Sequence, residues 1–320
     1  MRRTKYFILQ IVLVCLALCS CQDVEEPVYN VPSPYTCSAE NVSVTTAYLT
    51  GELYGGLYHY GDYYYNENYF VRKEFLISKS KTFTNCIRVN AGHEGGNTYY
   101  AKVERLDEGT TYYYKFKVTN IGVSDSDIVL EGAVKEFTTK EKGKAVDLGL
   151  SIKWADRNVG ADSSEGYGDY FAWGEIYTKD SYTEENSETY NRDIGDIAGH
   201  FKRDVAYADW GENWRLPSRE ECKELINKCT WTWTTQGGHK GYKVVGPNGK
   251  SIFLPATGLK EDNFTYNIGE KGIYWTSQPY LYNDDYISAY CFGFDVYDDN
   301  VPKTYWSYRH YGRSIRPVCE

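Results

Sequence analysis

The chain has 320 residues and a net charge of −9, and its first segment, residues 1–20, holds three cations and no acid. Without that segment the net charge is −12, which makes nucleic acids and anionic lipid headgroups poor partners. The remaining residues, about 300 in number, suggest two domains of ordinary size.

The N-terminus predicts a secretory signal peptide, because basic residues precede an apolar stretch over residues 6–18 and a region of small residues. Its ending, Leu18-Cys19-Ser20-Cys21, resembles the lipoprotein box of bacterial signal peptides. The resemblance implies cleavage after residue 20 and acylation of Cys21. Several acyl chains anchor a protein stably, so outer-membrane lipid is an expected partner. An ordinary cleaved secretory signal is the alternative.

Residues 21–36 predict a tether, since acidic residues and three prolines in this stretch cannot bury a core. The acidic run beside the lipidated cysteine resembles the surface-export signal of Bacteroidota lipoproteins. That resemblance implies a protein of the outer membrane that faces the cell exterior. A charged tether facing the periplasm is the alternative.

Residues 37–140 predict an all-β sandwich. Tyr112, Tyr114, Phe116 and Val118 alternate with more polar residues, which is the period-two pattern of a half-buried strand. The spacing of Leu106, Thr110 and Tyr112 resembles the tyrosine corner of fibronectin type III domains and related sandwiches. We expect Val44, Tyr48 and Leu49 in an early strand and residues 134–137 in the last one.

An insertion over residues 54–70 is rich in tyrosine. Tyrosine gives a contact surface large apolar area and a polar tip, so the insertion predicts a secondary recognition loop. An extended hairpin whose tyrosines pair across strands is the alternative. The candidate residues are Tyr58, Tyr60, Tyr63, Tyr64 and Tyr65.

A polar hinge over residues 141–144 leads to a second domain, residues 145–320, which holds all eight tryptophans. Within it, Ser218 and Glu221 have the spacing of a capping box at a helix start. Cys222, Leu225, Ile226 and Cys229 then form one apolar stripe. Off this stripe lie charged residues that we expect to be solvated: Arg219, Glu220, Lys223, Glu224 and Lys228. We interpret the segment as framework, because no nucleophile, base and orienting group occur together in it.

Short strands follow the predicted helix. Asn248-Gly249 between β-forming residues predicts a hairpin over residues 242–254. Further strands are expected at residues 272–277, 288–294 and 314–318, joined by long polar loops. Short strands, long loops and few helices indicate an α+β domain.

Seven blocks of this domain, in order, resemble the Fibrobacter succinogenes major paralogous domain, a family abundant in Bacteroidota lipoproteins. The blocks begin at Val146, Asn158, Tyr167, Trp210, Asn248, Tyr274 and Ser314 and include Trp214-Arg215-Leu216-Pro217. The resemblance implies a C-type-lectin-like α+β domain with long loops and adjacent termini. Arg157 stands where many members carry cysteine, so a family disulfide to Cys229 is not carried over.

Six cysteines remain beyond Cys21, and they allow fifteen full pairings. They are Cys37, Cys86, Cys222, Cys229, Cys291 and Cys319. Cys222 and Cys229 cannot pair on one helix, because seven residues rise roughly 10.5 Å and a disulfide needs Cα atoms within about 7 Å. We expect one of these two to pair with Cys319, with reduced buried thiols as the alternative.

Catalytic chemistry is not expected, and neither is a cofactor or a metal. Cys291 and Cys319 have apolar neighbours and no activating group, the five histidines are scattered, and phosphate-loop and nucleophile-elbow motifs are absent from the sequence. Residues 283–285 and 298–300 are rich in oxygen ligands, but the Glu-Pro-Asn and Trp-Asn-Asp motifs of calcium lectins are absent. We interpret these two runs as solvated loops.

Aromatic residues before and after the strand at 288–294 are the candidate ligand-binding residues, on loops near the place where lectin-like folds bind ligands. They are Tyr280, Tyr282, Tyr286, Tyr297, Tyr305, Trp306, Tyr308 and Tyr311. They predict non-catalytic recognition of a glycan or a host surface, as in adhesion. Aromatics that only fill a core are the alternative interpretation. The alternative function is a structural or interaction subunit of an outer-membrane assembly, which would bind a protein partner.

Overall fold

The structure is a computed structural model, and it describes residues 33–54, 58–60, 63–65, 72–120, 128–282, 285–295 and 302–320. The predicted signal peptide, Cys21, most of the tether and Tyr297 lie outside these ranges. Residues 33–36, predicted to end the tether, instead form a strand that pairs with residues 51–54. No helix within the described ranges has the length and apolar character needed to cross a bilayer.

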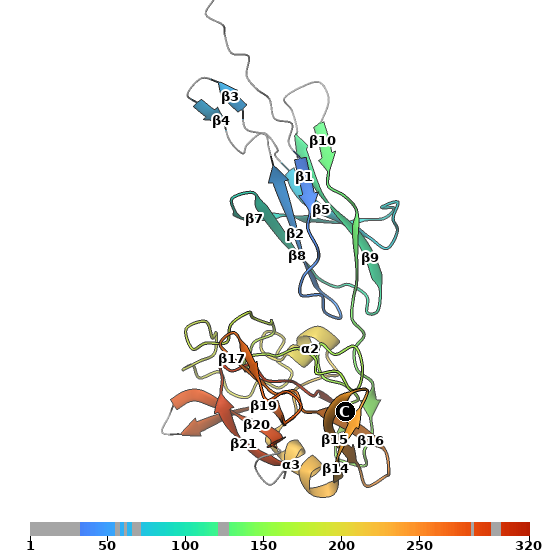
Figure 1. The fold of residues 1–320 in the computed structure, drawn as a ribbon, viewed down its shortest axis with the longest axis vertical. Coiled ribbons are helices and arrows are strands. Elements are labelled where there is room, and N and C mark those ends of the chain that lie inside the picture. The colour runs from blue at the N-terminus through green and yellow to red at the C-terminus, as the bar shows by residue number, and fades with distance from the viewer. Residues whose placement is uncertain are drawn as a thin grey trace, which may run out of the picture.

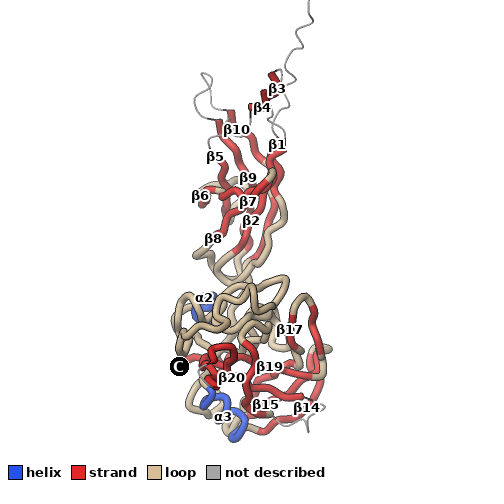
Figure 2. The backbone as a smooth tube through the Cα atoms, turned by 90° about the vertical axis from the view of Figure 1, so that its left-hand side faces the viewer, coloured by secondary structure: helices blue, strands red, loops and turns tan. Residues whose placement is uncertain are grey.

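The chain folds into two bodies arranged along one long axis (Figure 1). The N-terminal body contains only strands, and both helices described lie in the C-terminal body (Figure 2). The N-terminal strands are β1 (Ser33–Thr36), β2 (Ala47–Tyr54), β3 (Tyr58–Tyr60), β4 (Tyr63–Tyr65), β5 (Arg72–Ser78), β6 (Ile87–Asn90), β7 (Gly92–Gly95), β8 (Thr98–Val103), β9 (Thr111–Asn120), β10 (Ile128–Glu131) and β11 (Lys135–Thr138).

Two sheets of the N-terminal body enclose one hydrophobic core. One sheet has the order β1-β2-β8-β7, and the other has the order β10-β9-β5-β6 with β11 also paired to β9. The alternation predicted for β9 is confirmed: Tyr112, Tyr114, Phe116 and Val118 are all buried in the core. The tyrosine-corner bond is also present, because the Tyr112 hydroxyl accepts a hydrogen bond from the upstream backbone N–H of Asp107 at 2.9 Å.

The tyrosine-rich insertion contains a short hairpin of β3 and β4. Its register pairs Tyr58 with Tyr65 and Tyr60 with Tyr63. This backbone pairing agrees with the hairpin alternative. The hairpin lies at the end of the molecule remote from the C-terminal body (Figure 1), so it is separate from any site there.

The C-terminal body combines small sheets with long irregular segments. Its elements are β12 (Ala145–Val146), β13 (Lys153–Ala155), α2 (Val205–Trp210), α3 (Arg219–Lys228), β14 (Thr230–Gln236), β15 (His239–Val245), β16 (Ser251–Pro255), β17 (Leu259–Glu261), β18 (Phe264–Tyr266), β19 (Lys271–Tyr282), β20 (Asp285–Asp295), β21 (Lys303–Tyr308) and β22 (Val318–Cys319). The sheet β12-β13-β22 holds both ends of this body together.

Helix α3 begins as the sequence predicts. Ser218 and Glu221 form a reciprocal capping box, and Cys222 and Leu225 are buried. The hairpin at Asn248-Gly249 is confirmed as well, with β15 paired to β16 and Gly249 at a φ of 82°. The strand expected at residues 314–318 is wrong over most of its length. Only Val318 belongs to a strand, and Ser314 forms an isolated bridge with Tyr274.

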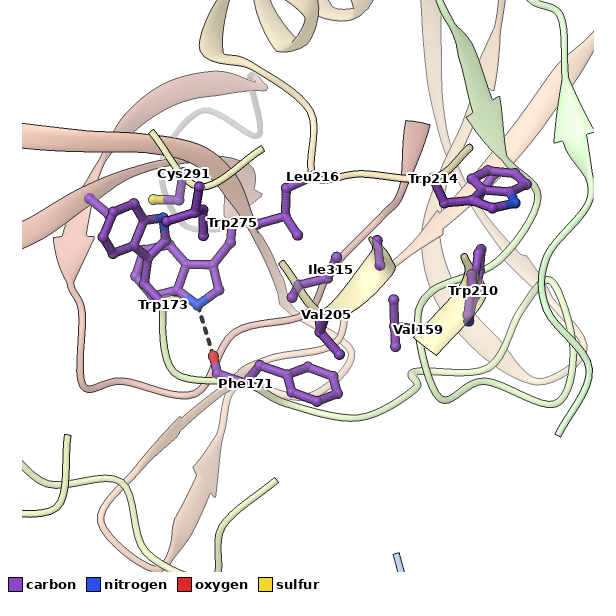
Figure 3. Close-up of a cluster of buried hydrophobic side chains, with 14 of the residues drawn as sticks. Val159, Phe171, Trp173, Val205, Trp210, Trp214, Leu216, Trp275, Cys291 and Ile315 are labelled. Carbon is purple, nitrogen blue, oxygen red and sulfur yellow. Dashed lines mark hydrogen bonds between the residues drawn. The ribbon is translucent and has the colours of Figure 1, made fainter. Parts of the chain in front are cut away.

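Tryptophans build much of the C-terminal core. Trp173 and Trp275 are fully buried beside Cys291, and Trp210 and Trp214 meet edge to face in another part of the same cluster (Figure 3). The indole N–H of Trp275 donates to the backbone carbonyl of Phe171 at 2.8 Å. A buried indole N–H without a partner is costly, so this bond helps to fix the ring in the core.

The two bodies are joined by packing as well as by the chain. Val44 was expected in a strand of the N-terminal body, and this expectation is wrong: Val44 lies in a loop and is buried in the tryptophan core of the other body. Its backbone N–H donates to the buried carboxylate of Asp209 at 3.1 Å. Lys140 reaches across to the carbonyl of Gly160 at 2.7 Å. The segment expected as a hinge, residues 141–144, therefore comes directly after a packed joint in the chain.

All six cysteines in the described ranges are free. The pairing expected between a helix cysteine and Cys319 is therefore not formed, and the alternative of reduced thiols describes the structure. Cys222 and Cys291 are completely buried, which raises the pKa of both thiols. These two cysteines act as small apolar residues of the core.

Candidate functional site

At one end of the sheet β19-β20-β21 both faces are covered, since Tyr274 and Phe292 are buried in a second core cluster, but at the other end the two faces differ in character. Side chains alternate across a strand, so neighbouring residues point to opposite faces. On the inner face, Trp275 and Cys291 are fully buried, and Tyr305 packs against the same core. The outer face, which we call the aromatic face, carries Tyr280, Tyr290, Trp306 and Tyr308.

Rings of the aromatic face contact one another across the strands. Tyr280 and Trp306 stack with centroids 5.7 Å apart and planes 13° apart. Tyr280 also meets Tyr290 edge to face at 5.2 Å, and Trp306 meets Tyr308 at 5.6 Å. Such pairs contribute roughly 0.5–1.5 kcal/mol beyond their burial, so the rings hold one another in fixed orientations.

A groove opens in this face because one central residue is small. Ser288 of β20 pairs with Tyr280 on one side and with Tyr308 on the other, so a hydroxymethyl group lies between two large rings. The groove has a volume of about 310 Å³, within the range of roughly 300–1,000 Å³ of small-molecule sites. We call it the aromatic groove, and its lining residues are Tyr280, Tyr282, Asp285, Ile287, Ser288, Trp306 and Tyr308.

The eight aromatic residues predicted from the sequence fall into separate groups. Four line the groove, namely Tyr280, Tyr282, Trp306 and Tyr308, and two of them stay open to solvent, with Tyr282 at 64% and Trp306 at 46% exposure. Six of the eight were expected on loops but lie on strands: Tyr280, Tyr282, Tyr286, Tyr305, Trp306 and Tyr308. Tyr311 lies just beyond β21.

Three further predicted residues, all described, do not line the groove. Tyr305 belongs to the inner face, where burial raises the pKa of its phenol well above the ordinary value. Tyr286 is half-buried in β20, and its carbonyl accepts a hydrogen bond from the Asn191 N–H. Tyr311 contacts Tyr308 edge to face at 5.6 Å and therefore supports the groove from behind.

Some contributors to the site were not predicted from the sequence. Ser288 and Tyr290 share the outer face with Tyr280, but both faces of β20 carry aromatic or apolar residues, so the alternation of this strand does not mark them. Arg219 was expected to be solvated, and this is wrong. Its guanidinium lies over the Tyr290 ring, 4.1 Å from the centroid. Helix α3 thus borders the aromatic face.

A buried arginine fixes the floor of the groove. Arg309 donates from its backbone N–H to the carbonyl of Ile287 at 2.9 Å and from Nε to the carbonyl of Ser288 at 3.0 Å. Its guanidinium also lies over the Trp173 ring at 4.3 Å. Because Arg309 is fully buried, it ties the floor residues to the tryptophan core and pre-organises the groove.

Among the described residues that line the groove, Asp285 alone carries a charge, on an exposed carboxylate. No cation among the described residues forms an ion pair with it. Rings, one hydroxyl and one carboxylate can stack on a ligand and accept its hydrogen bonds. They include no activated nucleophile.

The expected solvated loops are described only at Asp285, since residues 283–284 and 298–300 lie outside the described ranges. Within the described residues, no three His, Cys, Asp or Glu side chains converge as a metal site would require. Burial raises the pKa of Cys291 to about 12 and also raises the pKa of Cys319. Both groups are therefore protonated thiols at neutral pH, which makes them poor nucleophiles.

A larger crevice of about 1290 Å³ lies between the two bodies. Several of its charged groups are already paired. Lys102 pairs with Glu104, Lys140 pairs with Asp169, and buried Asp209 accepts from Val44. The contacts of Lys140 and Asp209 cross between the bodies, so part of the crevice belongs to the joint.

No family model and no curated protein matches the chain. Solved structures similar to part of it include three structures of the sensor domain of the anti-sigma factor RsgI4 of Pseudobacteroides cellulosolvens. A short form is 12% identical, with 35% of this chain and 97% of that chain covered and a TM-score of 0.24. The long form is 13% identical, with 37% and 98% covered and a TM-score of 0.24, and a solution structure is 13% identical, with 35% and 76% covered and a TM-score of 0.23. At such TM-scores the similarity carries no argument about fold or function.

Proposed function

We propose that this protein is a non-catalytic recognition protein that binds a glycan of a cell or host surface in the aromatic groove. One observation carries the proposal: around the groove, the outer face of β19-β20-β21 leaves the large rings of Tyr282 and Trp306 exposed, while the inner face is packed as core. The side chain of Trp306, for example, is 46% exposed. Exposed aromatic surface that a fold does not need for its core marks an interaction site.

The chemistry of the groove suits a sugar. Aromatic faces stack on the C–H faces of a pyranose ring, while the Ser288 hydroxyl and the Asp285 carboxylate accept hydrogen bonds from its hydroxyl groups. The groove is fixed by Arg309 and by ring contacts, so little ordering cost accompanies binding. These properties favour recognition over catalysis.

The wider setting of the site belongs to the same proposal. Cys21 anchors the chain in the outer membrane, and the molecule faces the cell exterior. The N-terminal body is a fibronectin type III-like spacer, and the C-terminal body is a C-type-lectin-like member of the major paralogous domain family. The joined ends in sheet β12-β13-β22 and the long irregular segments support that fold assignment, and the packed Val44 joint supports a stiff spacer.

A second candidate function is docking on a protein partner within an outer-membrane assembly. The observation that favours it is an exposed apolar patch on and beside the hairpin β17–β18. Phe264 is 63% exposed, Tyr266 45% and Ile268 48%. A patch of this kind on a hairpin matches a protein interface better than it matches a sugar.

Binding of residues 22–320 to a glycan array, with calcium and with a chelator, tests the proposal. We expect binding that survives chelation. Trp306→Ala should weaken it at least about tenfold, because truncated tryptophans at interface centres cost about 2 kcal/mol. Ser288→Phe should block it by filling the groove. The matched control is Phe264→Ala, which removes a more exposed ring elsewhere and should leave glycan binding unchanged.

The outcomes separate the two functions. Binding that is lost on chelation would replace the metal-free groove with a calcium site. Binding that Phe264→Ala reduces and Trp306→Ala leaves intact would move the site to the β17–β18 hairpin. Silence on the array, together with partners that co-purify with the native chain and not with Phe264→Ala, would favour the protein-docking function.

A further inference from the structure

The described lining of the aromatic groove carries negative charge and no positive charge. Tyr280, Tyr282, Trp306 and Tyr308 present aromatic rings, and Asp285 adds one carboxylate. Among the described residues, no lysine, arginine or histidine lines the groove. Arg219 is stacked on Tyr290, and Arg309 lies buried beneath the floor with its guanidinium bonded to backbone carbonyls.

The aromatic rings and the carboxylate of the groove both attract a positively charged ligand. The face of an aromatic ring is the negative part of its quadrupole, so it attracts a cation within about 6 Å of its centroid. The carboxylate of Asp285 attracts the same cation and is not engaged by a described basic side chain. An acidic ligand meets repulsion from both features, and a neutral ligand gains no charge attraction from either.

The position of Asp285 makes this preference specific to one end of the groove. The pairing of β19 with β20 shifts register between Tyr280 and Tyr282, and Asp285 pairs with Tyr282 beyond the shift. The stacked pair of Tyr280 and Trp306 lies on the other side of this shift. A ligand that stacks on the pair therefore extends toward the carboxylate.

We propose that the aromatic groove selects sugar residues that carry a protonated amino group, such as glucosamine units, over neutral sugars and over acidic sugars. This selectivity rests on the proposed glycan-binding function. The sugar ring stacks on Tyr280 and Trp306, and its ammonium group lies against Asp285 and the neighbouring ring of Tyr282. Charge complementarity is what distinguishes this ligand class from the other glycans.

The test compares three β-1,4-linked oligosaccharides of equal length by titration calorimetry with residues 22–320, at about pH 6, where amino groups are protonated. The probes are oligomers of glucose, of glucosamine and of glucuronic acid. We expect the glucosamine oligomer to bind about fivefold or more tightly than the glucose oligomer, and the glucuronic acid oligomer to bind most weakly. Added salt should reduce the difference, since part of it is Coulombic.

Asp285→Asn isolates the cause, because it removes the charge and keeps the size of an exposed side chain. The variant should weaken binding of the glucosamine oligomer more than binding of the glucose oligomer, and so reduce the preference for glucosamine to less than about twofold. Glu212→Gln, at an exposed acid in the loop after α2, is the matched control and should keep the full preference. Circular dichroism verifies that both variants are folded.

Each outcome addresses one claim. Equal binding of glucose and glucosamine oligomers overturns the charge selectivity and leaves the glycan function standing. If none of the three oligosaccharides binds, the glycan-binding function itself is overturned. A lysine-rich peptide without sugar that binds as tightly as the glucosamine oligomer, in an Asp285-dependent manner, overturns the sugar class and assigns the groove to a protein partner.

Discussion

On sheet β19-β20-β21, the inner face and the aromatic face contain similar residue types. The inner face packs as core, whereas the aromatic face leaves rings open to solvent. Each has a tryptophan, with Trp275 inside at 0% exposure and Trp306 outside at 46%. Each has tyrosines, with the phenol of Tyr305 buried and Tyr282 at 64% exposure. Residue type therefore does not decide between core and binding surface. What decides it is the segment that lies against each face.

Inside, long irregular segments cover the sheet and provide backbone partners for the indoles. Trp173 donates to the carbonyl of Thr276 at 2.9 Å, and Trp275 donates to Phe171. Outside, the rings of the aromatic face mainly contact one another and, through Tyr290, one arginine of α3. The comparison predicts that substitutions inside unfold the protein and that substitutions outside change binding.

The largest effect is expected for Trp275→Ala. The change removes a fully buried ring, its hydrogen bond to Phe171 and its contacts in the tryptophan core. Truncation of a buried tryptophan costs about 3–5 kcal/mol, a large part of the stability of a typical domain. Urea denaturation followed by tryptophan fluorescence measures it. A loss below about 1 kcal/mol would contradict the role of the inner face as core.

Adjacent residues of β21 give the sharpest version of the comparison. Tyr305→Ala should lower the free energy of unfolding by about 2–4 kcal/mol, since its phenol lies in the core. Trp306→Ala, one residue later, should cost about 1 kcal/mol or less, because mainly a ring stack is lost. Chemical denaturation of both variants measures the two losses in the free energy of unfolding. Equal costs would mean that the two faces do not differ in the way described.

A smaller effect is expected where the outer face meets α3. Arg219→Ala removes the guanidinium from the Tyr290 ring and should cost about 0.5–1 kcal/mol, the usual strength of a partly exposed cation–π contact. The matched control is Lys223→Ala, one turn later, whose ion pair with exposed Glu220 is screened by solvent and contributes little to stability. If Arg219→Ala proves no more costly than the control, the contact with Tyr290 adds nothing to stability.

Features with local causes could be predicted from the sequence. The capping box of α3 needs only residues 218 and 221, and the Asn248-Gly249 turn needs only its own backbone. The aromatic groove could be predicted in part, because four of its rings were identified. Their position on strands could not, since both faces of β20 carry aromatic or apolar residues and the alternation is hidden: Tyr286, Ile287, Ala289, Tyr290, Cys291 and Phe292.

The remaining failures come from partners far along the chain. Val44 stands between Ser43 and Thr45 and resembles a strand residue, and only Asp209 and the tryptophan core explain its burial. Arg219 lies off the apolar stripe of its helix, and its partner Tyr290 is on a strand much later in the sequence. Arg309 is fully buried because backbone carbonyls and the Trp173 ring surround it. Such pairings need the fold itself.

The smallest effect concerns pH at the end of the aromatic face, where His310 stacks on Tyr308 at 5.7 Å and also contacts Tyr190 and Tyr311. Burial lowers the pKa of this imidazole. Glu184, Asp262 and Glu185 oppose that change, and Arg313 reinforces it.

Because the folded-state pKa is lowered, the unfolded chain takes up a proton near pH 6.5 that the folded chain does not. The stability that neutral His310 provides is complete above that pH and is lost as the pH falls below it. His310→Phe keeps a ring against Tyr308 and cannot be protonated, so its free energy of unfolding should depend less on pH between about pH 5 and about pH 8. The resulting change in the free energy of unfolding should be smaller than the loss expected for Arg219→Ala. Urea denaturation of both proteins at the two pH values measures it, and parallel pH profiles would show that the imidazole stays accessible to protons in the folded face.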